Sequence, residues 1–392
     1  MGDTEDKWRA GRYIKQLTGY RAFIPAPLPP DPGIEMTSGL WEALSKADRA
    51  LGRLDGSATT LPDPDLFVFM YVRKEAVLSS QIEGTQASLA DLLEFESRQE
   101  AGQGIKDVAE VANYIAAMNL GLERLHDLPL SLRLIREIHA RLMTGVRGHN
   151  RTPGEFRVTQ NWIGPAGCTL SNARFVPPPP EIMLEMLGNL ENFFYDERPM
   201  PLLIRVGLAH AQFETLHPFL DGNGRVGRLL ITFLLCQAGV LQRPLLYLSH
   251  YFKLHRAEYY DRLQAIRDDG EWEGWLRFFL DGVYQVSQEA TETARKVVAM
   301  REEHRKQIGD HLGRSAGKAL ALHESLFKHP YMTVQQMTEV MGLSYSNANH
   351  LVGQIEAIGL LKEVTGQRRN RIYGYVPYLQ LFADGDEGSP AE

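Results

Sequence analysis

Residues 217–228 read His-Pro-Phe-Leu-Asp-Gly-Asn-Gly-Arg-Val-Gly-Arg, and an apolar helical run, Leu229 to Val240, follows at once. Backbone amides at a helix N-terminus are unpaired and carry the positive end of the helix dipole, so such a junction can hold an anion. Gly222 and Gly224 let the chain approach that anion closely. The stretch therefore predicts a phosphate-binding loop between two helices.

Four other side chains of this loop carry chemistry that suits a phosphate site. Arg225 and Arg228 are three residues apart, so on a helix they share one face and can reach the same phosphates. Asp221 offers a carboxylate to a magnesium ion that bridges phosphates. His217 has an ordinary pKa near ~6.5, which suits a general base. For any one of these residues alone, a role in a simple helix-to-helix link, with His217 as a cap, is the stronger interpretation.

The same loop satisfies the dinucleotide pattern G-x-G-x-x-G through Gly222, Gly224 and Gly227. That pattern requires a preceding β-strand. The upstream stretch, Leu202 to Leu216, has apolar residues spaced as in a helix, which argues against a Rossmann fold. The P-loop pattern G-x-x-x-x-G-K-[ST] does not occur in the sequence, which excludes that kind of nucleotide site.

Residues 217–228 match every defined position of H-P-F-x-[DE]-G-N-G-R-x-x-R, and the chain thereby resembles the Fic family. The resemblance implies a mostly helical fold and transfer of AMP from ATP to a Tyr, Thr or Ser hydroxyl of a target protein. It also implies roles for individual residues. These are His217 as the base, Asp221 as the Mg²⁺ ligand, Gly222, Asn223, Gly224, Arg225 and Arg228 around the ATP phosphates, and Tyr260 beside the adenine. For Tyr260, simple packing is the stronger alternative.

A second motif lies upstream, where apolar residues at helical spacing predict a helix over about 70–84. Ser79, Glu83 and Gly84 resemble the family's inhibitory motif [ST]-x-x-x-E-[GN]. A glutamate against Arg228 would replace the ATP γ-phosphate as its partner. An ordinary helix-end carboxylate is the alternative for Glu83. A further alternative is the reverse reaction, in which Glu83 positions a water that removes AMP from a modified protein.

Two short runs rich in β-branched and aromatic residues, within about 156–177, predict a β-hairpin. It resembles the family's flap, on which the target protein docks by strand addition, a contact that reads backbone more than side chains. Asn161 and Trp162 belong either to the pocket wall or to packing. A surface hairpin without a partner is the alternative. The proline-rich stretch Phe23 to Pro32 is predicted to be extended.

The C-terminal part, from about Lys318, resembles a winged helix-turn-helix with Ser344 as the N-cap of the recognition helix. Residues 318–377 hold six Lys/Arg and four Asp/Glu, a net charge of +2, with Arg368, Arg369 and Arg371 at the tip of the wing. DNA binding usually needs more positive charge. Two partners for this C-terminal part remain open. One is DNA, in which case the Fic domain would only sense nucleotide, and the other is a protein.

Composition is that of a cytoplasmic globular enzyme, with 44% hydrophobic and 23% charged residues among 392. The net charge of −7 argues against a whole-chain nucleic-acid binder, and two cysteines do not make a disulfide scaffold. No membrane segment is expected, and a homodimer is left open.

We predict an all-α protein with a β-hairpin flap and a winged helix domain. Its parts are 1–115 (N-terminal helices), 116–285 (catalytic core), 286–317 (helical connector), 318–380 (winged helix) and 381–392 (disordered tail).

Overall fold

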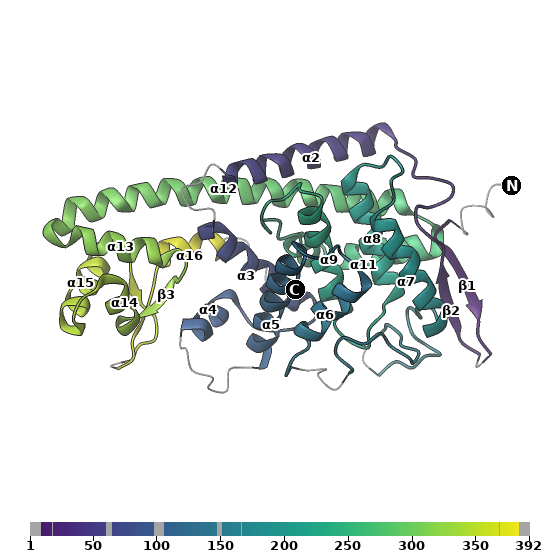
Figure 1. The fold of residues 1–392 in the computed structure, drawn as a ribbon, viewed down its shortest axis with the longest axis horizontal. Coiled ribbons are helices and arrows are strands. Elements are labelled where there is room, and N and C mark those ends of the chain that lie inside the picture. The colour runs from purple at the N-terminus through teal and green to yellow at the C-terminus, as the bar shows by residue number, and fades with distance from the viewer. Residues whose placement is uncertain are drawn as a thin grey trace, which may run out of the picture.

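The computed structural model describes residues 9–17, 19–59, 65–97, 106–146, 151–165, 167–367 and 369–383. Helices dominate (Figure 1), which confirms the predicted class. Most of the predicted C-terminal tail, from residue 384 on, lies outside the described residues, as does Arg368. Within the described ranges, none of the helices combines the length and apolarity needed to cross a membrane.

The helices and strands follow one another along the chain in the order β1 (Gly11–Lys15), β2 (Arg21–Pro25), α2 (Ser38–Thr59), α3 (Asp65–Ile82), α4 (Leu89–Ser97), α5 (Lys106–Arg124), α6 (Leu132–Leu142), α7 (Pro180–Phe194), α8 (Leu202–Leu216), α9 (Asn223–Gln237), α10 (Ser249–Leu254), α11 (Arg256–Asp269), α12 (Trp272–Leu312), a 3₁₀ turn (Gly313–Ser315), α13 (Ala316–Leu326), β3 (Tyr331–Thr333), α14 (Val334–Met341), α15 (Tyr345–Ala357), β4 (Lys362–Glu363), β5 (Ile372–Gly374) and α16 (Val376–Ala383).

Helix α12 is the longest element, with 41 residues and a length of about 60 Å. Helix α2 lies along it, and the two form one edge of the molecule in Figure 1. The predicted boundary between residues 285 and 286 falls inside α12, which runs unbroken from α8 and α11 to the C-terminal helices α13 and α16. Trp275 anchors the core end, because its ring is fully buried and its Nε1 donates to the Gly207 carbonyl of α8 at 2.9 Å.

Helices α8 and α9 lie at the centre of the core, and the 217–228 loop joins them. Between Leu203 and Leu216 every residue of α8 except Arg205 is buried. A helix that is apolar on all sides must be covered on all sides, and α7, α9 and α12 pack on it. The 217–228 loop is therefore attached to a helix that is buried along its length.

A close approach between α5 and α9 gives a stability prediction. A Cβ on Gly121 would lie 2.3 Å from Cζ of the buried Phe233. We expect Gly121→Ala to lower the free energy of unfolding, because overpacking costs about 1–3 kcal/mol, more than the roughly 1 kcal/mol gained in helix propensity. Gly52→Ala, in open space on α2, should have the opposite sign. Urea unfolding of both variants checks this, and equal shifts would contradict it.

The β-structure differs from the predicted flap. Strands β1 and β2 form an antiparallel hairpin at the N-terminus, with Gly11 opposite Pro25 and Lys15 opposite Arg21. The predicted flap region holds one isolated antiparallel bridge, between Ile163 and Phe175. Strand β2 lies beside the end of this region, where the Phe23 amide donates to the Val176 carbonyl at 2.9 Å.

The C-terminal elements run helix, strand, two helices, then two strands, with the sheet order β3-β5-β4. Ser344 stands at the N-cap of α15, and Arg371 donates to Asn349 on that helix at 2.8 Å. That these elements act as a winged helix-turn-helix stays a prediction.

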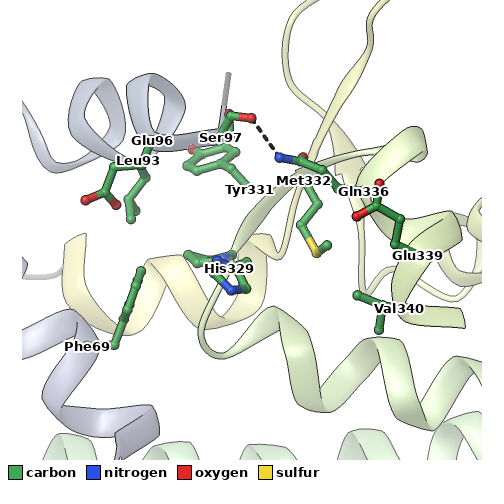
Figure 2. A pocket seen from close by; sticks show the side chains of 11 residues that line it. Phe69, Leu93, Glu96, Ser97, His329, Tyr331, Met332, Gln336, Glu339 and Val340 are labelled. Atoms are coloured by element: carbon green, nitrogen blue, oxygen red, sulfur yellow. Dashed lines mark hydrogen bonds between the residues drawn. The ribbon is translucent and has the colours of Figure 1, made fainter. Parts of the chain in front are cut away.

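These C-terminal elements touch the helix that bears the predicted inhibitory motif. The Lys74 Nζ of α3 donates to the Phe382 carbonyl of α16 at 3.2 Å, and the Tyr71 ring meets the Phe382 ring edge-on at 5.7 Å. Beside this contact a cavity of about 260 Å³ separates α3 and α4 from β3 and α14. Figure 2 shows the side chains across it, with Gln336 bonded to the Ser97 carbonyl at 2.9 Å.

Candidate active site

The loop between α8 and α9 begins and ends with left-handed residues. His217 closes α8 with φ 46° and ψ 59°, and its amide donates to the Phe213 carbonyl at 3.0 Å. Gly222, with φ 78°, stands at the N-cap of α9. A non-glycine residue in this conformation is uncommon and strained. The loop therefore turns sharply enough to bring His217 next to the first turn of α9.

The middle of the loop is pinned by two buried side chains. Asn223 accepts from the Phe219 amide and donates to the Phe219 carbonyl, each at 2.8 Å. Phe219 is fully buried, and its ring stacks on His139 with centroids 3.7 Å apart. The side chain of Asn223 is thus engaged with backbone, which leaves the amides of this turn to face an anion.

His139, which the sequence analysis did not single out, ties the loop to α6. The Gly154 amide donates to its Nδ1 at 2.8 Å, so Nδ1 is the acceptor and Nε2 carries the proton. Nε2 lies 3.0 Å from the Asp221 carbonyl and donates to it. Burial lowers the pKa of His139 to about 4, which keeps the ring neutral. His139 therefore fixes the backbone of Asp221.

Arg228 is paired with the predicted inhibitory motif. Its Nε donates to Ser79 Oγ at 2.8 Å, and its Nη2 donates to the Ser79 carbonyl at 2.9 Å and to Glu83 Oε1 at 2.8 Å. Gly84 follows with φ 96° and ends this turn. A Cβ on Gly224 would lie 2.2 Å from Glu83 Oε1. The Glu83 carboxylate therefore sits directly over the first turn of α9, where the anion was predicted to bind.

The charges of this ion pair are well defined. Burial raises the pKa of Glu83, but Arg228 outweighs that effect and holds it below its usual value. Burial of Arg228 lowers its pKa, but the nearby acidic groups, Glu83 first among them, together outweigh this effect and raise the pKa of Arg228 above its usual value. The arginine side chain is 2% exposed and the glutamate 34%. The arginine is therefore enclosed, whereas part of the glutamate side chain faces solvent.

Arg225 is held by a carboxylate that the sequence did not reveal. Its Nη1 lies 3.4 Å from Glu110 Oε2 on α5, and both side chains are 3% exposed. Its Nη2 lies 4.0 Å from Asp221 Oδ1. A buried cation between two carboxylates stays in place without a ligand, so Arg225 is pre-positioned beside Asp221.

Tyr260 lies on α11, with its ring centroid 5.1 Å from that of Tyr259. Burial raises the pKa of Tyr260 to about 12, and the nearby Glu83 adds to this. Tyr260 is thus a neutral phenol on the Glu83 side of the site. Tyr259 is fully buried and serves packing.

His210 lies on α8, about two turns before His217, and gives a pH prediction. Its Nδ1 is 2.8 Å from the Gly227 carbonyl and its Nε2 is 2.9 Å from the Tyr259 hydroxyl, which satisfies a neutral ring. Burial lowers its pKa to about 3. Below about pH 6.5 the unfolded chain gains a proton that the folded protein refuses, so stability falls as the pH drops towards 3.

We expect the wild type to lose about 2 kcal/mol more free energy of unfolding than His210→Gln between pH 7.5 and 5. The figure is about 1.4 kcal/mol for each pH unit below 6.5. Urea unfolding of both proteins at the two pH values measures it. Equal losses in the two proteins would show that the ring of His210 takes up a proton while folded.

The donors present fit a magnesium ion held with nucleotide phosphates. Asp221 has a side chain 41% exposed, and its Oδ1 accepts from the Gly222 amide at 2.7 Å. Among the described residues, no cluster of three or more His, Cys, Asp or Glu could hold a metal on its own. Magnesium bound with substrate phosphates characteristically uses one or two carboxylates, so a single carboxylate is appropriate here.

Comparison with known proteins agrees with this geometry. Residues 41–123 match the Fic/DOC family N-terminal domain, and residues 129–235 match the Fic/DOC family domain. The chain carries both Fic/DOC domains. The Fic domain spans α6 to α9 and includes the whole 217–228 loop, and the N-terminal domain includes Ser79, Glu83 and Gly84.

Relatives of this Fic protein include the "Protein adenylyltransferase Fic" of Culex quinquefasciatus, 31% identical over 207 residues, which are 51% of this chain and 38% of that protein. The "Probable protein adenylyltransferase" of Aquifex aeolicus is 26% identical over 175 residues, 45% of this chain and 51% of that protein. The matched region is thus about half or less of these relatives' length.

Solved structures show the same fold. A Fic family protein from Desulfovibrio desulfuricans G20 superposes with a TM-score of 0.55 at 17% identity, over 87% of this chain and 97% of that one. A Fic domain containing signaling protein from Bacteroides thetaiotaomicron gives 0.50 at 18% identity, over 66% and 97%. The first alignment extends beyond the Fic core of this chain.

Proposed function

We propose that this Fic protein is a protein adenylyltransferase that moves AMP from ATP to a hydroxyl of a target protein and releases pyrophosphate. The observation that carries the proposal is the juxtaposition of His217, the amides of the first turn of α9 and two buried arginines at one loop. Adenylyltransferase names among the relatives support it.

In this proposal His217 removes the proton from the target hydroxyl. Burial lowers its pKa to about 4, and the nearby cations Arg157 and Arg267 add to this, so the ring is neutral and able to accept a proton at pH 7. The hydroxyl oxygen attacks the α-phosphorus, and the bond to the pyrophosphate oxygen breaks. Arg225, Arg228 and the α9 amides stabilise the charge that develops on the phosphates. Magnesium on Asp221 would screen the same charge.

The described state is inhibited in this scheme. Glu83 occupies the position over Gly224 and holds Arg228, so the outer phosphates of ATP cannot take the same partner. Misplaced phosphates would not align for in-line attack. Activity requires the carboxylate to move away.

The target is proposed to dock at the 156–177 segment. Two apolar side chains, Val158 and Trp162, are 86% and 42% exposed there, next to the catalytic loop. Asn161 donates from Nδ2 to the His217 carbonyl at 3.2 Å and to the Phe219 carbonyl at 3.0 Å, which ties this segment to the base. An extended target segment pairing beside Ile163 and Phe175 would present its hydroxyl to His217.

Two labelled nucleotides test the reaction type. The protein with Glu83→Gly is incubated with magnesium and with ATP carrying radioactive phosphorus at either the α or the γ position. AMP transfer predicts protein-bound label from the α position only, together with equimolar pyrophosphate. Label from the γ position would identify a phosphotransferase instead, and free phosphate without protein label would identify a hydrolase.

Removal of AMP from a modified protein is the second candidate, because the Glu83 carboxylate lies over the first turn of α9 and its side chain is 34% exposed. In that reaction Glu83 positions the water, so Glu83→Gly would abolish activity on an AMP-modified protein. The two candidates therefore predict opposite signs for one substitution.

A further inference from the structure

Arg157 is a buried cation whose guanidinium is bound by backbone carbonyls. It is 1% exposed, and its Nε donates to the His217 carbonyl at 3.0 Å. Its Nη2 donates to the Pro178 carbonyl at 2.6 Å and to the Leu216 carbonyl at 3.4 Å. In the described part of the chain, no ion pair joins Arg157 to a carboxylate. A buried charge with only carbonyl partners is costly, so its place in the fold calls for a reason.

The carbonyls of Leu216 and His217 belong to the last turn of α8, where they lack partners within the helix and form the negative end of its dipole. His217 itself is in the strained left-handed conformation. The Arg157 amide also donates to the Pro218 carbonyl at 2.9 Å. One residue thus bonds to three consecutive carbonyls at the point where the chain turns out of α8.

Two charged groups besides Arg157 face the His217 ring. Arg267 of α11 stacks on Phe175 at 3.8 Å and donates to Thr215 at 3.2 Å. Glu83, in the turn after α3, provides the opposing charge. The carbonyl of Glu214, on α8, faces the ring as well. Arg157 and Arg267 both disfavour a protonated imidazole, whereas Glu83 favours it. Arg157 therefore sits where it controls both the direction of the ring and its charge.

We propose that Arg157 is the positioning residue for His217: its planar fork holds the turn that aims the imidazole into the site. Its charge also disfavours protonation of that imidazole, in addition to the larger effect of burial. An arginine suits this task because it presents several donors in one plane, which a lysine cannot do. The kinetic part of the inference rests on the proposed AMP transfer.

The test compares Arg157→Met, Arg157→Lys and Arg136→Met, all with Glu83→Gly. Arg136 lies nearby and donates to the Gly154 carbonyl at 2.7 Å, but makes no contact with His217, so it is the matched control. We expect Arg157→Met to lower kcat by about 100-fold, as small misplacements of reacting groups do, with the KM for ATP unchanged. The acid limb of the pH profile of Arg157→Met should also lie at a higher pH than that of the parent with Glu83→Gly alone.

Arg157→Lys separates the two roles. It retains the charge, so the acid limb of its pH profile should stay where it is, while kcat still falls because the fork is lost. Unchanged kcat in Arg157→Met, or a raised KM at constant kcat, would overturn the proposal. So would an acid limb that shifts equally in the Lys and Met variants.

A second readout does not depend on catalysis. The ¹H–¹³C signal of the His217 ring, assigned from His217→Asn, should shift and titrate at higher pH in Arg157→Met but not in Arg136→Met. If none of the proteins transfers AMP, the proposed function fails, and this signal still decides the role of Arg157. An identical His217 signal in all variants overturns it. If Arg157→Met does not fold, Arg157→Lys still tests the positioning role, because its kcat should fall and its His217 signal should shift without a change in the pH at which it titrates.

Discussion

Replacing Glu83 with glycine should convert a silent protein into one that labels itself or its target with AMP. The Glu83 carboxylate bonds to Arg228 at 2.8 Å and covers Gly224, so its removal frees the arginine and the space that ATP phosphates require. A hydrogen bond between charged groups contributes about 1.5–3 kcal/mol. The rate of transfer should therefore rise by about 10- to 100-fold, measured by intact mass spectrometry after incubation with ATP and magnesium.

Gln81→Gly is the matched control for this gain. Gln81 lies in the same last turn of α3, but its amide donates to the Ala87 carbonyl at 2.9 Å and does not touch Arg228. Gln81→Gly introduces the same backbone flexibility but leaves the Glu83 carboxylate in place, so this variant should transfer no AMP. Equal activation by both glycines would attribute the effect to a loosened helix instead. Loss of activity in Glu83→Gly on an AMP-modified protein would favour AMP removal.

Loss of His217 should have the second large effect, a fall in transfer of about 10²- to 10⁴-fold in the Glu83→Gly background, the range that general bases contribute. His217 stands at φ 46°, a conformation that strains alanine. His217→Asn is therefore the better variant, because asparagine tolerates the left-handed region. Single-turnover transfer of AMP measures the loss.

Affinity for ATP separates a chemical defect from a binding defect. His217→Asn should bind ATP as the Glu83→Gly parent does, since the arginines and the α9 amides are unchanged. The control for loss of a histidine is His126→Ala, because His126 is exposed and is distant from His217 in the sequence. Transfer that persists in His217→Asn would assign the base to another group.

The sequence was most informative where the chemistry is local. The predicted helix over 70–84 lies within α3 and the turn after it. The predicted helical run Leu229 to Val240 starts within α9 but extends three residues past its end at Gln237. Pairing of Arg228 with Glu83 was expected from the resemblance, and their contact at 2.8 Å is consistent with it. The contact of Arg228 with Ser79 was not predicted. Their assignment as regulatory groups stays a prediction.

Residues that act across long separations had no signal in the sequence. His139 reaches Asp221 and Glu110 reaches Arg225 from helices whose periodicity shows only which face is buried. The Ile163–Phe175 bridge is isolated for a related reason. Arg157 and Asn161 bond to carbonyls within residues 216–219, so the chain before Ile163 follows the 217–228 loop and not a partner strand.

Helix α16 has a practical consequence for experiments on this protein. Phe382 packs on Tyr71, and its carbonyl accepts from Lys74, both of which belong to the helix that leads to Glu83. A chain cut before residue 376 would uncover the Tyr71 ring and loosen α3 at its far end. Rates measured on such a shortened protein would mix the loss of the C-terminal elements with a release of Glu83, so the full chain is the reference for every comparison.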